Sequence, residues 1–135
     1  MRWNCTTQGC FNVKKRPKIE RLADCLPGRN AFTDLDAITE INGNLLVLEW
    51  KDHRRLHTGQ RILFERMTAL CPATVLIVEG DAEAKEVVSN TPVWAGRIGL
   101  PEPGDFQSLR TMVSAWSRWA LANPATGRAQ RMVCN

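Results

Sequence analysis

An Asn-Gly pair at residues 42–43 limits the possible folds of this chain more than any other local feature. Asn-Gly favours a two-residue type I′ turn, because both central residues of that turn adopt positive φ. Apolar runs flank the pair on both sides, which predicts a β-hairpin over Ala31–Lys51. A two-residue turn also sets the register of the two strands. We therefore expect Ile41 to pair with Asn44. Each residue before Ile41 should then pair with the residue that lies equally far after Asn44.

The same register brings charged side chains together at the open end of the hairpin. It pairs Asp36 with Glu49, and Asp34 with Lys51. Side chains alternate along a strand, so all four share one face. Directly opposed residues have Cβ atoms about 4.5–5.5 Å apart, so one cation can contact the carboxylates of Asp36 and Glu49. Without a cation the two charges would repel each other, and the alternative is a hairpin that ends in solvated charges.

Asp36 and Glu49 offer the ligand type that Mg²⁺ or Mn²⁺ prefers. Such cations bind carboxylate oxygens and retain several waters. A bound metal ion lowers the pKa of its water and stabilises charge on a phosphate. Lys51 follows Glu49 by two residues and can neutralise a phosphate or orient the attacking water. A second Glu-x-Lys triplet, at residues 83–85, follows a turn and lacks an opposed aspartate.

The remaining patterns predict an α/β protein with a mixed central β-sheet flanked by helices. Apolar residues on both faces of the hairpin are typical of strands that are covered on both sides. A helical apolar stripe predicts a helix over Thr58–Leu70 that Thr58 caps. The β-branched run 73–79 predicts a buried parallel strand. The further expected elements are a short helix to about Leu26, an edge strand over Pro92–Ile98, and a last helix capped by Asp105 that ends near Ala122.

Length and composition favour one domain in the cytoplasm. The chain has 135 residues, of which 44% are hydrophobic, enough for a single core. It contains no apolar run of about 18 residues, so we expect no membrane span. Its first residues lack the apolar segment of a signal peptide. We expect one domain over 1–135, with 1–15 as a cysteine-containing extension and 124–135 as a tail.

Part of the chain resembles the PD-(D/E)XK nuclease superfamily. The resemblance is carried by T-D-L-D at 33–36, L-V-L-E-W-K at 46–51, and Gln60 in the following helix. It covers about residues 19–79 and implies a nuclease-like core around the hairpin. The chain departs from the pattern because the literal Pro-Asp is absent, and because only residues 10–13 are available for a strand before the hairpin. The segment is similar to small phage-encoded members, which would act in the host cytoplasm.

The resemblance implies an activity and a set of site residues. The activity is metal-dependent hydrolysis of DNA phosphodiester bonds, for example by a structure-selective endonuclease that resembles a Holliday-junction resolvase. The implied catalytic residues are Asp36, Glu49, Lys51 and Gln60, with Asp36 and Glu49 as ligands of the metal. Asp34 competes with Asp36 as the metal-binding aspartate. Glu20 matches the place of an additional acidic ligand in some members, and it is otherwise a solvated helix charge.

The basic residues favour a polyanionic partner, with DNA the expected one. The net charge is +4 and the pI is about 9.0. Clustered near the hairpin, basic side chains would form a phosphate-binding surface; scattered, they are ordinary solubilising charge. The candidate nucleic-acid-binding residues are Lys14, Lys15, Arg16, Lys18, Arg54 and Arg55, and Arg61 and Arg66 are basic residues of the next helix.

The five cysteines argue against a disulfide scaffold, because their number is odd and no secretion signal is present. Cys5 and Cys10 can supply half of a zinc site, and free thiols are the alternative. The further zinc ligands would be Cys25, His53 or His57. We expect Cys71 to be a buried thiol, because it lies in an apolar stretch.

Two other classes of protein compete with the nuclease. One is a nucleic-acid-binding module without catalysis, stabilised by zinc at Cys5 and Cys10. The other is a phage regulator that uses the fold to bind a host protein and has no affinity for DNA. A homodimer would lengthen the short DNA footprint of one subunit, and an exposed Trp119 would mark its surface.

Overall fold

The structure is a computed structural model that describes residues 19–28, 30–52, 56–81, 84 and 86–125. The chain divides into two compact units, residues 1–34 and residues 35–135. In the described part of the chain, none of the helices combines the length and the apolar composition that a membrane crossing requires.

The first unit contains a short 3₁₀ helix, η1, over Ile19–Cys25. The predicted helix before Leu26 is therefore present, in the tighter 3₁₀ form. A turn follows at Pro27, whose carbonyl accepts hydrogen bonds from the Asn30 backbone N–H at 3.3 Å and from Asn30 Nδ2 at 2.7 Å. Gly28 has a φ of +65°, which favours glycine at this position.

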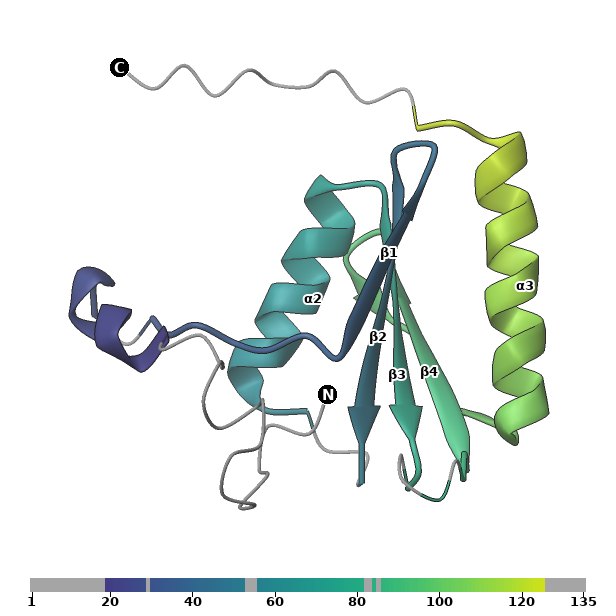
Figure 1. Ribbon diagram of the computed structural model, residues 1–135, viewed down its shortest axis with the longest axis horizontal. Coiled ribbons are helices and arrows are strands. Elements are labelled where there is room, and N and C mark those ends of the chain that lie inside the picture. The colour runs from purple at the N-terminus through teal and green to yellow at the C-terminus, as the bar shows by residue number, and fades with distance from the viewer. Residues whose placement is uncertain (1–18, 29, 53–55, 82–83, 85, 126–135) are drawn as a thin grey trace, which may run out of the picture. The chain divides into compact units, whose positions relative to one another are not determined.

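The second unit is a mixed β-sheet with one helix on each face. Its elements are β1 (Ala37–Ile41), β2 (Asn44–Lys51), α2 (Thr58–Leu70), β3 (Ala73–Glu79), β4 (Ser89–Trp94), β5 (Arg97–Ile98), β6 (Glu102–Pro103) and α3 (Phe106–Ala122). The strand order is β1-β2-β3-β4-β5, with β6 also paired to β4. β2 and β3 are parallel, and the other pairs are antiparallel. Figure 1 shows α2 and α3 on opposite sides of the sheet, which confirms the α/β class.

The β1–β2 hairpin has the predicted turn and register. Asn42 and Gly43 have φ values of 51° and 83°, as a type I′ turn requires. The backbone ladder runs from the pair Ile41–Asn44 to the pair Ala37–Leu48. It does not continue to Asp36, so the predicted strand begins later than expected, at Ala37.

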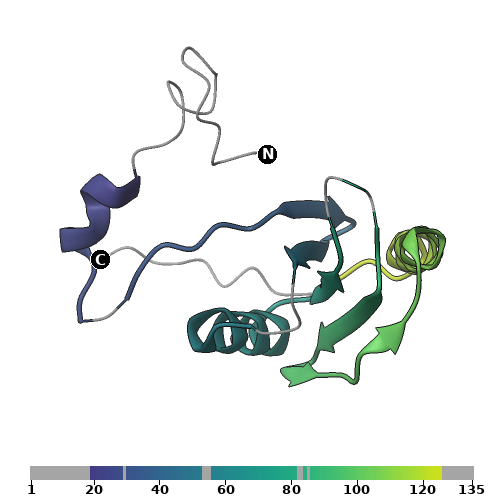
Figure 2. The same cartoon turned by 90° about the horizontal axis from the view of Figure 1, so that it is seen from below.

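Two apolar clusters cover the two faces of the sheet. Figure 2 shows the sheet end-on between α2 and α3. Because neighbouring residues of a strand point to opposite faces, Val47 packs on the α2 side and Leu46 on the α3 side. The α2 cluster contains Val47, Phe64, Val75, Ile77 and Val93. The α3 cluster contains Leu46, Leu76, Val78, Val87 and Leu109, with Trp50 and Trp116 packed against it.

The prediction of one edge strand over Pro92–Ile98 is wrong, both in the bounds of the strand and in its position within the sheet. The strand β4 begins earlier, at Ser89, and pairs with β3 on one side and with the short β5 and β6 on the other. A turn interrupts the predicted range at Ala95 and Gly96, with φ values of 49° and 77°. The turn is held against α2, because the Gly96 backbone N–H donates to Thr68 Oγ1 at 3.0 Å.

The ends of α2 also correct two expectations. The N-cap residue is His57, without a side-chain capping hydrogen bond, and Thr58 is the first helical residue. Cys71 is exposed and not buried, because it follows the last turn of α2 as the C-cap residue. The helix bounds themselves, Thr58–Leu70, are those that the apolar stripe predicts.

Asp105 caps α3 as predicted, and this contact should make stability depend on pH. The Ser108 backbone N–H donates to Asp105 Oδ1 at 2.8 Å, and this bond, with that of the Ser108 hydroxyl, lowers the pKa of Asp105 below its ordinary value of 3.8. Because the pKa of Asp105 is lower in the folded than in the unfolded protein, the ionised carboxylate contributes fully to the free energy of unfolding above pH 3.8. This contribution is lost as the pH falls through the pKa of the folded state. Wild type should therefore exceed Asp105→Asn in melting temperature near neutral pH, and the gap should narrow in acid.

Thermal unfolding followed by circular dichroism at neutral and acidic pH measures that gap. Asparagine is the matched control, because it keeps a side-chain acceptor for the Ser108 N–H without a titratable group. Asp105→Ala should be the least stable of the three proteins at neutral pH. A gap between wild type and Asp105→Asn that does not change with pH would contradict the assignment.

Candidate functional site

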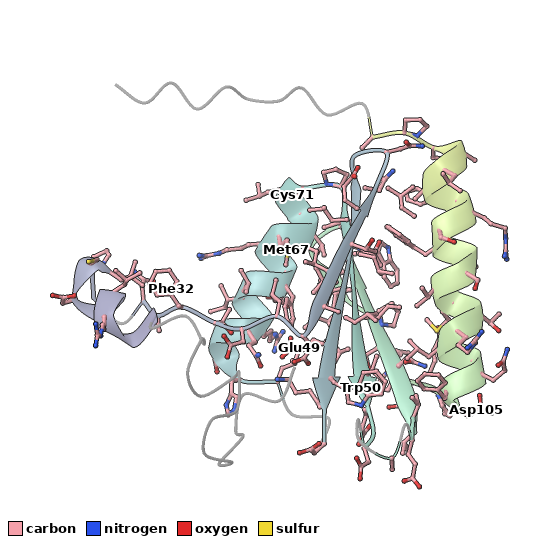
Figure 3. All side chains as sticks on the ribbon, viewed as in Figure 1. Phe32, Glu49, Trp50, Met67, Cys71 and Asp105 are labelled. Atoms are coloured by element: carbon pink, nitrogen blue, oxygen red, sulfur yellow. The ribbon has the colours of Figure 1, made fainter. Side chains whose placement is uncertain are left out.

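Three predicted site residues meet on the α2 side of the sheet. Glu49 and Lys51 lie two residues apart on β2, so their side chains share a face. Gln60 lies in the first turn of α2, which packs against that same face. Figure 3 shows Glu49 on the α2 side and Trp50 on the α3 side of the sheet. We call Glu49, Lys51 and Gln60 the Glu49 cluster.

Both donors of the Glu49 cluster contact the same carboxylate oxygen. Glu49 Oε1 accepts a hydrogen bond from Gln60 Nε2 at 2.7 Å and lies 2.7 Å from Lys51 Nζ. The Glu49 side chain is 4% exposed, whereas that of Lys51 is 20% exposed. Hydrogen bonds to an ionised group are shorter and stronger than neutral ones. The carboxylate is therefore held in one orientation, and the Lys51 side chain is the more exposed member of the ion pair.

The other oxygens of the cluster are buried without a donor. Glu49 Oε2 and Gln60 Oε1 have no hydrogen-bond partner among the described residues. An unsatisfied buried acceptor costs about 1–3 kcal/mol, so most buried polar atoms are paired with protein or water. Two such oxygens in one cluster form an arrangement that a cation or an ordered water would stabilise.

Asp36 is anchored to β2 by its side chain. Its Oδ2 accepts a hydrogen bond from the Trp50 backbone N–H at 2.6 Å. The carboxylate thus takes the place of a backbone carbonyl just beyond the last ladder pair, which explains why β1 begins at Ala37. The bond holds the Asp36 carboxylate beside the residue that follows Glu49, and its role as the partner metal ligand stays a prediction.

The end of β2 is fixed from the opposite face through Gly80. The indole Nε1 of Trp50 donates to the Gly80 carbonyl at 3.2 Å, and the Gly80 N–H donates to the Lys51 carbonyl at 3.0 Å. Gly80 has a φ of +155°, and a Cβ there would overlap the Glu86 carbonyl. The close approach of the backbone at Glu86 therefore requires glycine at position 80. The hydrogen bond from the Gly80 N–H in turn fixes the backbone of Lys51 at the end of β2.

Glu79 is a neighbour of the site that the motif did not single out. It pairs in parallel register with Lys51, and its Oε2 accepts a hydrogen bond from the Ser89 hydroxyl at 2.8 Å. Adjacent strands lie about 4.8 Å apart, so the two side chains are near each other on one face. The sequence did contain a signal for it: Glu79 ends the predicted strand 73–79, and parallel strands end at the same edge of a sheet.

The structure describes only some of the other residues that the sequence analysis named. Asp34 is exposed and belongs to the first unit, as does Glu20, which lies in η1. Cys25 is an exposed free thiol, and His57 is exposed. Within the described ranges, no group of three or more His, Cys, Asp or Glu residues is arranged to hold a metal ion. Of the residues that the sequence analysis named, those outside the described part of the chain include Cys5, Cys10, Lys14, Lys15, Arg16, Lys18, His53, Arg54, Arg55, Glu83 and Lys85.

Comparisons with known proteins add no relative. The chain matches no protein-family model, no curated protein and no solved structure.

Proposed function

We propose that this chain is a metal-dependent deoxyribonuclease of the PD-(D/E)XK type. The observation that carries the proposal is the Glu49 cluster, in which a buried carboxylate contacts a lysine and a glutamine and keeps one oxygen without a donor. The hairpin β1–β2, the helix α2 and the parallel strand β3 support it, because these elements surround the site in the expected order.

The residues present fit a hard divalent cation. Glu49 Oε2 and the carboxylate of Asp36 would supply oxygen ligands, and Mg²⁺ commonly binds one or two carboxylates and completes its shell with water and phosphate oxygens. Gln60 Oε1 is a neutral oxygen of the same kind. A cation bound there would act as a Lewis acid on the phosphate and lower the pKa of a bound water.

The protein groups have separate roles in this proposal. Gln60 orients Glu49, because its amide holds Oε1 and leaves Oε2 as the ligand oxygen. Lys51 places a positive charge at the solvent side of the cluster, where it stabilises the negative charge that develops on the phosphate. An ammonium group has further N–H donors besides the one that contacts Glu49, and these can bind a phosphate oxygen.

A panel of DNA substrates tests the proposal. Plasmid, linear duplex, single-stranded and four-way DNA are incubated with Mg²⁺, with Mn²⁺ and with EDTA. Cleavage of at least one substrate with metal, and none in EDTA, is the expected result. Calorimetric titration with Mn²⁺ gives a second readout that does not need a substrate.

The panel also separates the alternatives. DNA binding without cleavage under either metal would favour the non-catalytic binding module. Neither binding nor cleavage would favour a regulator that binds a protein. Elemental analysis for zinc tests the site predicted at Cys5 and Cys10 independently of both.

A further inference from the structure

A cavity of about 440 Å³ lies next to the Glu49 cluster on the same side of the sheet. Ile77 and Glu79 of β3 line it, and in the parallel register they pair with Glu49 and Lys51. Arg61, which directly follows Gln60 on α2, also lines the cavity. The cavity therefore adjoins the cluster both along the sheet and along α2.

The lining combines apolar walls with a few polar groups. Ser89 and Thr91 contribute hydroxyls from β4, and the Ser89 hydroxyl is oriented by its bond to Glu79. The apolar part of the lining consists of Leu56, Ile77, Ile98 and Pro101. Pockets of about 300–1,000 Å³ with this mixture are typical of sites for small organic groups.

Arg61 adds positive charge at the solvent side of the cavity. Its side chain is 63% exposed, and its Nε donates to Glu65 Oε1 at 3.0 Å. The terminal NH₂ groups of a guanidinium are further donors, with a geometry that suits phosphate oxygens. Because the lining itself carries the Glu79 carboxylate and the positive charge lies at its exposed side, the cavity suits the uncharged, partly apolar part of a ligand whose anionic group lies outside it, near Arg61. A nucleotide, with an uncharged base and a separate phosphate, is such a ligand.

We infer that the cavity holds the base of one unpaired nucleotide next to the scissile phosphate, with Arg61 on a neighbouring phosphate. This inference rests on the proposed function, because the Glu49 cluster supplies the position of the reacting phosphate. A base enters such a cavity only after it leaves the helical stack, which is least costly in single-stranded DNA. Single-stranded or locally unpaired DNA is then the preferred substrate.

Binding measured in EDTA tests the cavity without cleavage. Fluorescence anisotropy compares a labelled single strand with the duplex of the same length at one salt concentration. Thr91→Met places a larger side chain in the lining of the cavity. It should weaken single-strand binding roughly tenfold or more, because a mismatch of even one methylene group can change the fit to a pocket by that factor. Duplex binding should change little.

A second variant keeps the test independent of any folding defect. Arg61→Gln changes an exposed helical residue and should also weaken single-strand binding. Its matched control is Arg110→Gln, an exposed arginine of α3 on the other side of the sheet, which should bind like wild type. Circular dichroism checks the fold of each variant.

The outcomes separate this inference from the proposed function. Equal binding of single strand and duplex, or unchanged single-strand binding by both Thr91→Met and Arg61→Gln, would overturn the cavity as a base site even if cleavage is observed. Single-strand binding that depends on Thr91, with no cleavage under any metal, would support the cavity and reject the nuclease.

Discussion

Replacement of Glu49 by glutamine is expected to lower metal-dependent cleavage roughly 10³-fold, because a Lewis acid contributes several kcal/mol to such a reaction. Glutamine has the same shape, and its carbonyl oxygen can still accept the hydrogen bonds that Glu49 Oε1 accepts from Lys51 and Gln60. The change removes the negative charge that would bind the cation. Single-turnover cleavage and calorimetric titration with Mn²⁺ should therefore both show the loss, while circular dichroism shows a retained fold.

Glu102→Gln is the matched control for this prediction. Glu102 is an exposed glutamate of β6, so the same chemical change there should leave cleavage and Mn²⁺ binding at the wild-type level. If Glu49→Gln cleaves DNA at the wild-type rate with the same metal concentration, Glu49 is not a metal ligand and the proposed function fails.

Replacement of Lys51 by alanine tests the same site, but its effects on cleavage and on stability are harder to separate. Lys51→Ala would leave the Glu49 carboxylate, whose side chain is only 4% exposed, without its positive partner. An uncompensated buried charge is destabilising, so lost cleavage could follow from lost structure. Glu49→Gln avoids this problem, because it removes the buried charge and keeps a hydrogen-bond acceptor.

Phe64→Ala is expected to cost about 3–5 kcal/mol of the free energy of unfolding. Phe64 is fully buried between α2 and the sheet, and it packs in the cluster with Val47 and Val75. The loss is a large part of the roughly 5–15 kcal/mol that stabilises a typical domain. Because Phe64 is one turn beyond Gln60 on α2, the variant should also weaken the contact of Gln60 with Glu49.

Urea denaturation measures this loss, and Phe106→Ala is the matched control. Phe106 is 36% exposed at the start of α3, so the same truncation should cost clearly less. Similar losses for both variants would mean that the α2 cluster does not carry the stability assigned to it.

Local sequence was enough to predict the hairpin and several element ends. Asn42 and Gly43 favour positive φ by themselves, so the turn and the pairing of Ile41 with Asn44 follow from a few neighbouring residues. The apolar stripe over Thr58–Leu70 and the carboxylate of Asp105 act in the same local way. The turn depends on backbone preference and the Asp105 cap on contacts within one turn of helix, whereas the stripe is a periodic pattern that can be recognised along the sequence.

Strand alternation and helix periodicity also placed the cluster residues on the elements where the structure has them. Alternation along β2 put Glu49 and Lys51 on one face, and the helix bounds put Gln60 in the first turn of α2. The same rules could not place the exposed Cys71, because apolar neighbours in sequence do not say which side of a helix end faces solvent.

Tertiary packing decided the chemistry of the site itself. The approach of α2 to the sheet brings Gln60 Nε2 and Lys51 Nζ to the same oxygen of Glu49 and encloses the other one. The bond from the Trp50 N–H to Asp36 ends the ladder before the predicted Asp36–Glu49 pair. Pattern and propensity describe separate segments, whereas these contacts depend on the distance between segments, which only the packing of the whole core sets.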